Sequence, residues 1–70
     1  MSVFATFPDD ILEINISNKN ITGSLDFSRF TNLIKLDCST NKITELNNLP
    51  KTLKKIFCDK NNITQLDNLP

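Results

Sequence analysis

The second half of the chain contains one pattern twice, at a spacing of twenty residues. Aliphatic residues, a cysteine, an asparagine and a closing Leu-Pro pair recur, and each position is identical or an aliphatic substitution. The two copies read Leu33-x-x-Leu36-x-Cys38-x-x-Asn41-x-Ile43-Thr44-x-Leu46-x-x-Leu49-Pro50 and Leu53-x-x-Ile56-x-Cys58-x-x-Asn61-x-Ile63-Thr64-x-Leu66-x-x-Leu69-Pro70. One such unit cannot enclose a core by itself, so we expect successive units to stack and bury their apolar sides against each other.

A weaker copy and a half copy extend the repeat toward the N-terminus. The run Ile11-x-x-Ile14-x-Ile16 lies 22 residues before its counterpart, and Phe4-x-x-Phe7-Pro8 matches the closing residues of the later copies. We therefore expect residues 1–10 to form an N-terminal cap or half repeat. Residues 11–70 are expected to form about three repeats, in an array that is open or truncated at its C-terminus. The expected repeats span residues 11–32, 33–52 and 53–70.

These positions resemble the leucine-rich repeat, whose motif L-x-x-L-x-L-x-x-N/C-x-L recurs about every 20–29 residues. The resemblance covers residues 4–70, and the short unit is similar to repeats of bacterial effector proteins, large DNA viruses and amoebae. It implies a solenoid with short parallel β-strands on its concave face and a mostly irregular or extended convex side. The first repeat is two residues longer and lacks the closing proline, so a 3₁₀ turn or short helix fits on its convex side.

Alternation along the implied strands separates core residues from surface residues. Leu36 and Cys38 are expected to point inward and Asp37 outward. The same rule assigns to the core Ile14, Ile16, Ile56 and Cys58. Because leucine-rich repeats usually bind partners on the concave face, the resemblance implies that the outward residues form a partner-binding face. These residues are Glu13, Asn15, Lys35, Asp37, Ser39, Lys55, Phe57 and Asp59.

Phe57 is the strongest single candidate on this face, because an aromatic side chain that faces water resembles an interface anchor. A second reading stays open, in which a following repeat, a cap or a neighbouring subunit covers the ring. Lys54, Lys55 and Lys60 add positive charge around Phe57, and we expect them to form a solvated face.

Asn41 and Asn61 stand where the chain turns out of a strand and backbone groups lose their sheet partners. A short amide side chain can donate and accept hydrogen bonds there at once. The resemblance implies that these stacked amides form a structural ladder between neighbouring turns. The first repeat has Lys19 at this position, so either Asn18 or Asn20 takes its place or this end of the ladder is irregular.

Composition argues against catalysis. The chain has no histidine and a formal charge of zero, which removes the usual proton-transfer residue and any general attraction to nucleic acid. Cys38 and Cys58 lack the spacing and the histidine partners of zinc sites, and we expect two buried thiols. A disulfide between them is not excluded, because neighbouring strands lie about 4.8 Å apart. We expect no enzyme, no catalytic residue, no cofactor and no metal.

The first residues lack the charged start, apolar run and cleavage site of a signal peptide, and no apolar run approaches the length of a membrane span. We therefore expect an intracellular protein, in the cytoplasm of the producing or host cell. The leading hypothesis is a protein–protein interaction module without catalysis. The alternative is a structural or assembly component of a larger complex, for example a viral particle. In that case a neighbouring chain or an oligomer completes the open end near residues 66–70.

Overall fold

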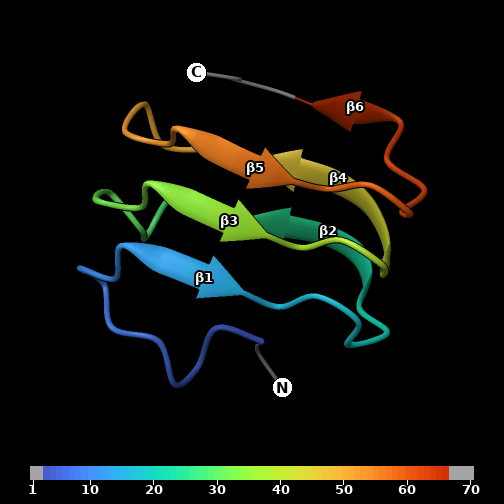
Figure 1. Ribbon diagram of the computed structural model, residues 1–70, viewed down its shortest axis with the longest axis horizontal. Helices are drawn as coiled ribbons and strands as arrows, with labels where there is room; N and C mark the ends of the chain where they lie inside the picture. Colours follow the sequence, from blue (N-terminus) through green and yellow to red (C-terminus); the bar gives the residue numbers. More distant parts are fainter. Residues whose placement is uncertain (1–2, 67–70) are drawn as a thin grey trace.

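Six short strands form two parallel sheets in the computed structural model, which describes residues 3–66 (Figure 1). The first sheet contains, in order, β1 (Glu13–Asn15), β3 (Lys35–Asp37) and β5 (Lys55–Phe57). The second sheet contains β2 (Thr22–Asp26), β4 (Lys42–Asn47) and β6 (Gln65–Leu66). Every pairing between these strands is parallel, which confirms the prediction of short parallel strands.

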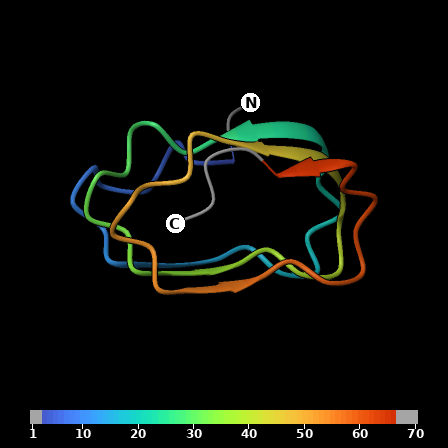
Figure 2. The same ribbon diagram turned by 90° about the horizontal axis from the view of Figure 1, so that it is seen from above.

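The chain alternates between the two sheets, so neighbouring strands of one sheet are always separated in sequence by a strand of the other. Figure 2 shows the sheets on opposite sides of the molecule, with the chain turning between them at both ends. Apolar side chains fill the space between the sheets and form one cluster. The largest fully buried side chains are Phe27, Phe30, Leu33, Leu36, Ile43, Leu46 and Cys38.

The second sheet is more regular than the irregular or extended side that the sequence predicted. Ile43 and Leu46 are both fully buried although they lie three residues apart, which departs from the two-residue period of a regular strand. The register explains this, because it shifts between Gly23 and Ser24 and leaves Thr44 of β4 without a partner in β2. Such a bulge returns the later side chain to the core. Gly23 accommodates the bulge with a φ of 82°, which other residues rarely adopt.

No helix is present in residues 3–66, so the short helix considered for the first repeat does not form there. Instead, the N–H of Phe30 donates to the carbonyl of Phe27 at 3.0 Å and closes a single turn after β2. Both phenylalanine side chains are fully buried. The turn thus places two large rings in the core within four residues of chain.

The two additional residues of the first repeat lie in the turn between β1 and β2. Glu13 pairs with Lys35, which is 22 positions later, whereas Thr22 pairs with Lys42, which is only 20 positions later. Between the second and third repeats, paired residues are 20 positions apart in both sheets. Residues 16–21 therefore take up the two residues, and the additional Thr44 in the bulge of β4 is balanced by one more residue between β2 and β3 than between β4 and β5.

Each strand of the first sheet leads into a turn with a left-handed residue at the same position, and the longer first turn has a second one, Asn20, with a φ of 58°. Asn18, Thr40 and Lys60 hold equivalent positions, with φ values of 54°, 57° and 57°. Asparagine tolerates this region, whereas other side chains lose about 1–2 kcal/mol in it. Hydrogen bonds between successive turns hold the backbone there. The N–H of Asn18 donates to the carbonyl of Ser39, and the N–H of Thr40 to that of Asp59, both at 3.0 Å.

Asn41 connects two of these turns through its side chain. Its Oδ1 accepts hydrogen bonds from the N–H groups of Lys19 and Ile21, at 3.0 and 2.9 Å. Its Nδ2 donates to the carbonyls of Ile16 and Cys38, both at 3.0 Å. The residue is only 8% exposed, so water cannot replace these bonds freely. One amide therefore satisfies backbone groups that the sheets leave without partners.

Asn61 repeats part of this arrangement one turn later. Its Nδ2 donates to the carbonyls of Cys38 and Cys58, at 2.9 and 3.1 Å, and its Oδ1 accepts from the N–H of Ile43 at 3.0 Å. In the first repeat the two asparagines that flank Lys19 are exposed. The turn of the first repeat is therefore bonded by the Asn41 side chain of the second repeat and has no buried asparagine side chain of its own.

Residues 3–10 pack onto the first repeat through two phenylalanine rings. Phe4 is buried, and its ring centroid lies 5.1 Å from that of Phe27 and 5.0 Å from that of Phe30. Phe7 is half-buried beside it, with its centroid 6.2 Å from that of Phe4. These tilted and edge-on arrangements are the favourable ones for aromatic pairs.

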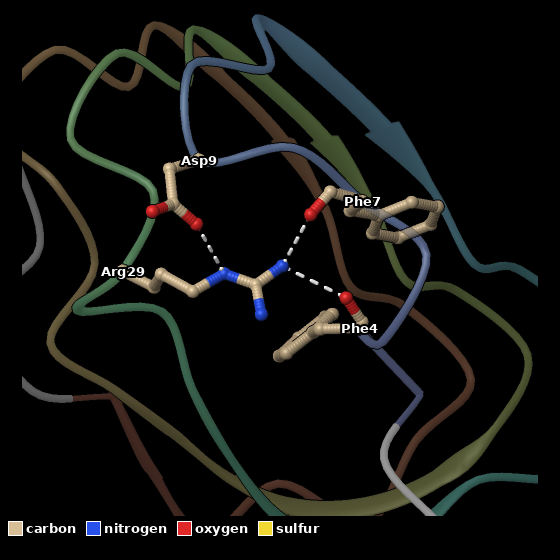
Figure 3. Close-up of polar contacts among 4 residues, drawn as sticks. All are labelled: Phe4, Phe7, Asp9 and Arg29. Atoms are coloured by element: carbon tan, nitrogen blue, oxygen red, sulfur yellow. Dashed lines mark hydrogen bonds and ion pairs between the residues drawn. The ribbon is translucent and has the colours of Figure 1, made fainter.

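Arg29 fixes the same segment through polar contacts (Figure 3). Its Nη2 donates to the carbonyls of Phe4 and Phe7, at 2.8 and 2.6 Å, and its Nε lies 2.8 Å from Oδ1 of Asp9. The guanidinium carbon also lies 4.5 Å from the centroid of the Phe30 ring, within the range of a cation–π contact. One side chain thereby joins three positions of the N-terminal segment to the core.

Replacement of Asn41 by alanine is expected to lower the free energy of unfolding by about 3 kcal/mol or more, because several buried N–H and C=O groups lose their partner. Asn62→Ala is the control, since that side chain is exposed and its loss should change stability by less than about 0.5 kcal/mol. Urea unfolding followed by circular dichroism measures both values. Equal losses in the two variants would contradict the role given to the Asn41 amide.

Arg29→Lys is expected to loosen residues 3–10 by about 1–2 kcal/mol, because one ammonium group cannot reproduce a guanidinium whose Nη2 donates to both carbonyls while its Nε reaches Asp9. Asp9→Asn removes only an exposed ion pair and should cost less than about 0.5 kcal/mol. Hydrogen–deuterium exchange of the segment reports both effects. A larger increase in exchange for Asp9→Asn than for Arg29→Lys would show that the ion pair, and not the carbonyl contacts, holds the segment.

Candidate functional site

The outward side chains of β1, β3 and β5 form two adjacent rows, which we call the first-sheet face. The strand register sets one row as Glu13, Lys35 and Lys55. It sets the other row as Asn15, Asp37 and Phe57. Ser39 and Asp59 lie two residues beyond the ends of β3 and β5, where backbone hydrogen bonds between the repeats continue. The structure therefore brings the predicted partner-binding residues onto one side of one sheet.

Phe57 is the large apolar side chain of this face. It ends β5, its Cα partner in β3 is Asp37, and the side chain is 46% exposed. The row places one short polar residue, Asp37, on the neighbouring strand β3, and Asn15 lies one strand further on β1. A half-exposed aromatic ring bordered by polar residues is the arrangement found at interface anchors.

Leu12 is a second exposed apolar side chain, 54% exposed, which the repeat pattern did not predict. It directly precedes β1, and its carbonyl accepts hydrogen bonds from the N–H groups of Ile34 and Lys35, at 2.8 and 3.2 Å. The repeat pattern assigns Ile11 to the core and says nothing of the next residue.

Hydrogen bonds within the turns fix the polar members of the second row. Oδ1 of Asn15 accepts from the N–H and hydroxyl of Ser17, at 3.0 and 2.8 Å. Oδ1 of Asp37 accepts from the N–H and hydroxyl of Ser39, at 3.1 and 2.7 Å. Phe57 holds the equivalent position in β5 and cannot accept such bonds. The third repeat therefore has the apolar Phe57 where the first two repeats have Asn15 and Asp37, whose side chains stabilise the turn. The sequence alone shows this difference between the repeats.

The structure divides the basic residues near Phe57 into two groups. Lys54 and Lys55 line one hollow together with Lys35, at the start of β3 and β5. Lys60 lines a different hollow, beside the left-handed turn residue Thr40. The three lysines that the sequence placed around Phe57 thus belong to different parts of the surface.

Cys38 follows β3 and Cys58 follows the neighbouring strand β5, and neither cysteine forms a disulfide. Cys38 is fully buried and Cys58 is half-buried. Burial, reinforced by the neighbouring Cys58 and Asp37, raises the pKa of the Cys38 thiol to about 12. Burial also raises the pKa of Cys58, with a further contribution from Asp59. Both side chains are therefore neutral thiols at physiological pH and contribute to the core as small apolar groups.

Within residues 3–66, no group of three or more histidine, cysteine or acidic side chains is arranged to hold a metal ion. Nor does this part of the chain contain a helix with the length and apolar character needed to cross a membrane. No protein-family model, curated protein or solved structure matches the chain. The first-sheet face is therefore interpreted from its own side chains.

Thiol labelling is expected to be slow in the folded protein, because the thiolate is the reactive form and its fraction is low at pH 8. The pKa of about 12 for Cys38, against an ordinary value of 9.0, lowers the thiolate fraction about a thousandfold. Cys58 should react before Cys38, and both should react fully in guanidinium chloride. Mass spectrometry after maleimide treatment measures the order.

The pH dependence gives a second readout of the same prediction. A raised pKa means that labelling of Cys38 continues to accelerate above pH 9, whereas an unfolded thiol approaches its plateau there. Labelling of Cys38 at the unfolded rate would contradict its burial. Failure of both thiols to react in guanidinium chloride under non-reducing conditions would reveal a disulfide.

Proposed function

We propose that the chain is a leucine-rich repeat module, a short solenoid that binds a protein partner through the first-sheet face and has no catalytic role. Three observations support the repeat assignment. The apolar pattern recurs at twenty residues, each sheet gains one strand per repeat, and a buried asparagine joins successive turns. In such arrays the aligned strands present a rigid surface, and its side chains select the partner.

The observation that carries the proposed function is the exposure of Phe57, at 46%, on the aligned face of β5. Burial of an exposed aromatic ring is favourable by about 25 cal/mol per Å² of apolar surface removed from water. The ring is also flanked by groups suited to the polar rim of an interface, Lys55 and Asp59 on its own chain segment and Asp37 on the neighbouring strand. A partner that covers Phe57 gains an apolar contact and meets polar groups around it.

The chemistry of the face favours recognition over reaction. Its side chains supply carboxylates, lysines, an amide, a hydroxyl and one aromatic ring, a set that forms hydrogen bonds and ion pairs with another protein surface. Cys38 and Cys58 directly follow the neighbouring strands β3 and β5, and two free thiols at such positions are typical of proteins in a reducing compartment. We therefore propose an intracellular binding role.

A second candidate is a structural or assembly role within a larger complex. Ile56, Cys58 and Ile63 of the third repeat are half-buried, although their counterparts in the second repeat are fully buried. A neighbouring chain that packs against β5 and β6 would bury these side chains. The predicted open end beyond β6, residues 67–70, lies outside the described residues.

Phe57→Ala is the variant that tests the binding proposal. Peptides selected from a displayed library on the folded chain should bind Phe57→Ala about thirtyfold more weakly, since loss of an interface anchor costs about 2 kcal/mol or more. Leu12→Ala is the matched control, because it removes a similarly exposed apolar side chain that precedes β1 and should change affinity less than twofold. Fluorescence anisotropy measures both.

Thermal unfolding checks that both variants keep the fold, because substitutions at exposed side chains should change stability by less than about 0.5 kcal/mol. Selected peptides that bind Phe57→Ala and the unmodified chain equally well would contradict the proposed face. A library that yields no binder to the folded chain would contradict the proposal as well.

A further inference from the structure

A shallow hollow of about 290 Å³ opens on the first sheet where β3 and β5 begin. The residues that line it are Glu13, Ile34, Lys35, Lys54 and Lys55. Three lysines thus face one glutamate, and the half-buried Ile34 and the methylene chains of the lysines provide apolar walls. The hollow combines positive charge with apolar surface.

Neither Lys35 nor Lys55 forms an ion pair within the described residues, and one glutamate stands against the three lysines of the hollow. The register places the two lysines directly opposite each other, and like charges at such positions repel. On the β1 side of β3, Glu13 is the Cα partner of Lys35, but the two side chains form no ion pair. The ion pair found within residues 3–66 joins Arg29 and Asp9. A carboxylate from another molecule, placed between the two ammonium groups, would relieve this repulsion.

The nearest acidic residue of the next row cannot take that role. Asp37 is half-buried, and its Oδ1 already accepts two hydrogen bonds from Ser39. Its carboxylate is therefore held toward the turn that follows β3. The positive charge at the start of β3 and β5 remains available to a partner.

Phe57 lies two residues after Lys55 on the same side of β5. Two residues of an extended strand span about 6.6–6.8 Å. In an extended peptide, residues i and i+2 are separated by the same distance as Lys55 and Phe57. An acidic residue opposite Lys55 and an apolar residue two positions away match the lysine and the ring together.

We propose that the partner presents an acidic, extended protein segment to this part of the first-sheet face. One or two carboxylates of the segment lie between Lys35, Lys54 and Lys55, and an aliphatic or aromatic side chain two residues away packs on Phe57. This inference rests on the proposed function, because it specifies the chemistry of the partner that the face binds.

A protein segment fits this surface better than a nucleic acid. The lysines of the first-sheet face are confined to the hollow, where Glu13 lies beside them, and Asp37 and Asp59 lie further along the same face. A continuous phosphate backbone would meet these carboxylates, and the chain as a whole has no net charge to attract it. A short acidic segment with one apolar residue places its negative charge only where the lysines are.

The test uses the full chain and dye-labelled peptides with the core Glu-Glu-Ser-Leu between glycine and serine residues. Control peptides carry Gln-Gln-Ser-Leu or Glu-Glu-Ser-Ser, and a thymidine oligonucleotide of equal charge represents nucleic acid. We expect the Glu-Glu-Ser-Leu peptide to bind most tightly, and its affinity to fall as salt is raised from low to physiological concentration.

The double variant Lys35→Gln/Lys55→Gln should bind this peptide about tenfold more weakly. The control Lys42→Gln/Lys51→Gln removes two exposed lysines outside the first sheet, gives the same net charge and should stay within twofold. Chemical-shift mapping on the unmodified chain locates the bound peptide without any variant, with changes expected in β3, β5 and residue 54.

Three results would overturn the inference: equal weakening in the two double variants, oligonucleotide binding as tight as that of the acidic peptide, or chemical-shift changes that leave β3, β5 and residue 54 unaffected. Failure of this inference is distinguishable from failure of the proposed function. Library-selected peptides that depend on Phe57 but lack acidic residues would refute the acidic segment and leave the binding face intact. Binders that depend on neither Phe57 nor the lysines would refute both.

Discussion

The fold depends on how the backbone is satisfied where the chain leaves the first sheet. At this turn the carbonyls of Ile16 and Cys38 and the N–H groups of Lys19 and Ile21 have no strand partner, and the Asn41 side chain bonds to all four. Because these groups belong to successive turns, the bonds fix the distance and angle between neighbouring repeats. They support the alignment of β1 with β3, and the Asn61 side chain supports the alignment of β3 with β5 in the same way, through Cys38, Cys58 and Ile43.

The first sheet could be predicted from the sequence because its signals are local and repeated. A spacing of twenty residues between Leu36 and Ile56 fixes their register, and alternation then decides that Asp37 and Phe57 point away from the core. The same reasoning could not find the second sheet. Two buried residues three positions apart fit a turn, an irregular segment or a bulged strand equally well, and only pairing with a neighbour selects the bulge.

The parts of the surface that escaped prediction depend on contacts between distant residues. The hollow beside Lys35 needs Ile34 from one repeat and Lys54 from the next, and neither belongs to the alternating strand pattern. Arg29 donates hydrogen bonds to the carbonyls of Phe4 and Phe7, which are more than twenty residues earlier in the sequence. Leu12 is exposed at a position that the repeat pattern does not specify. A repeat pattern describes what is common to all units, whereas these features arise where one unit differs from the next.

The turn between β1 and β2 shows where a chain of this kind can change in length. Two more residues are present there than in the following repeat, yet both sheets keep their pairing on either side. Oδ1 of Asn41 accepts from Lys19 and from Ile21, so a single oxygen holds the backbone on both sides of the exposed Asn20. Chain length can therefore differ between repeats at this turn without a change in the pairing of β1 with β3, the strands that carry the first two positions of each row of the first-sheet face.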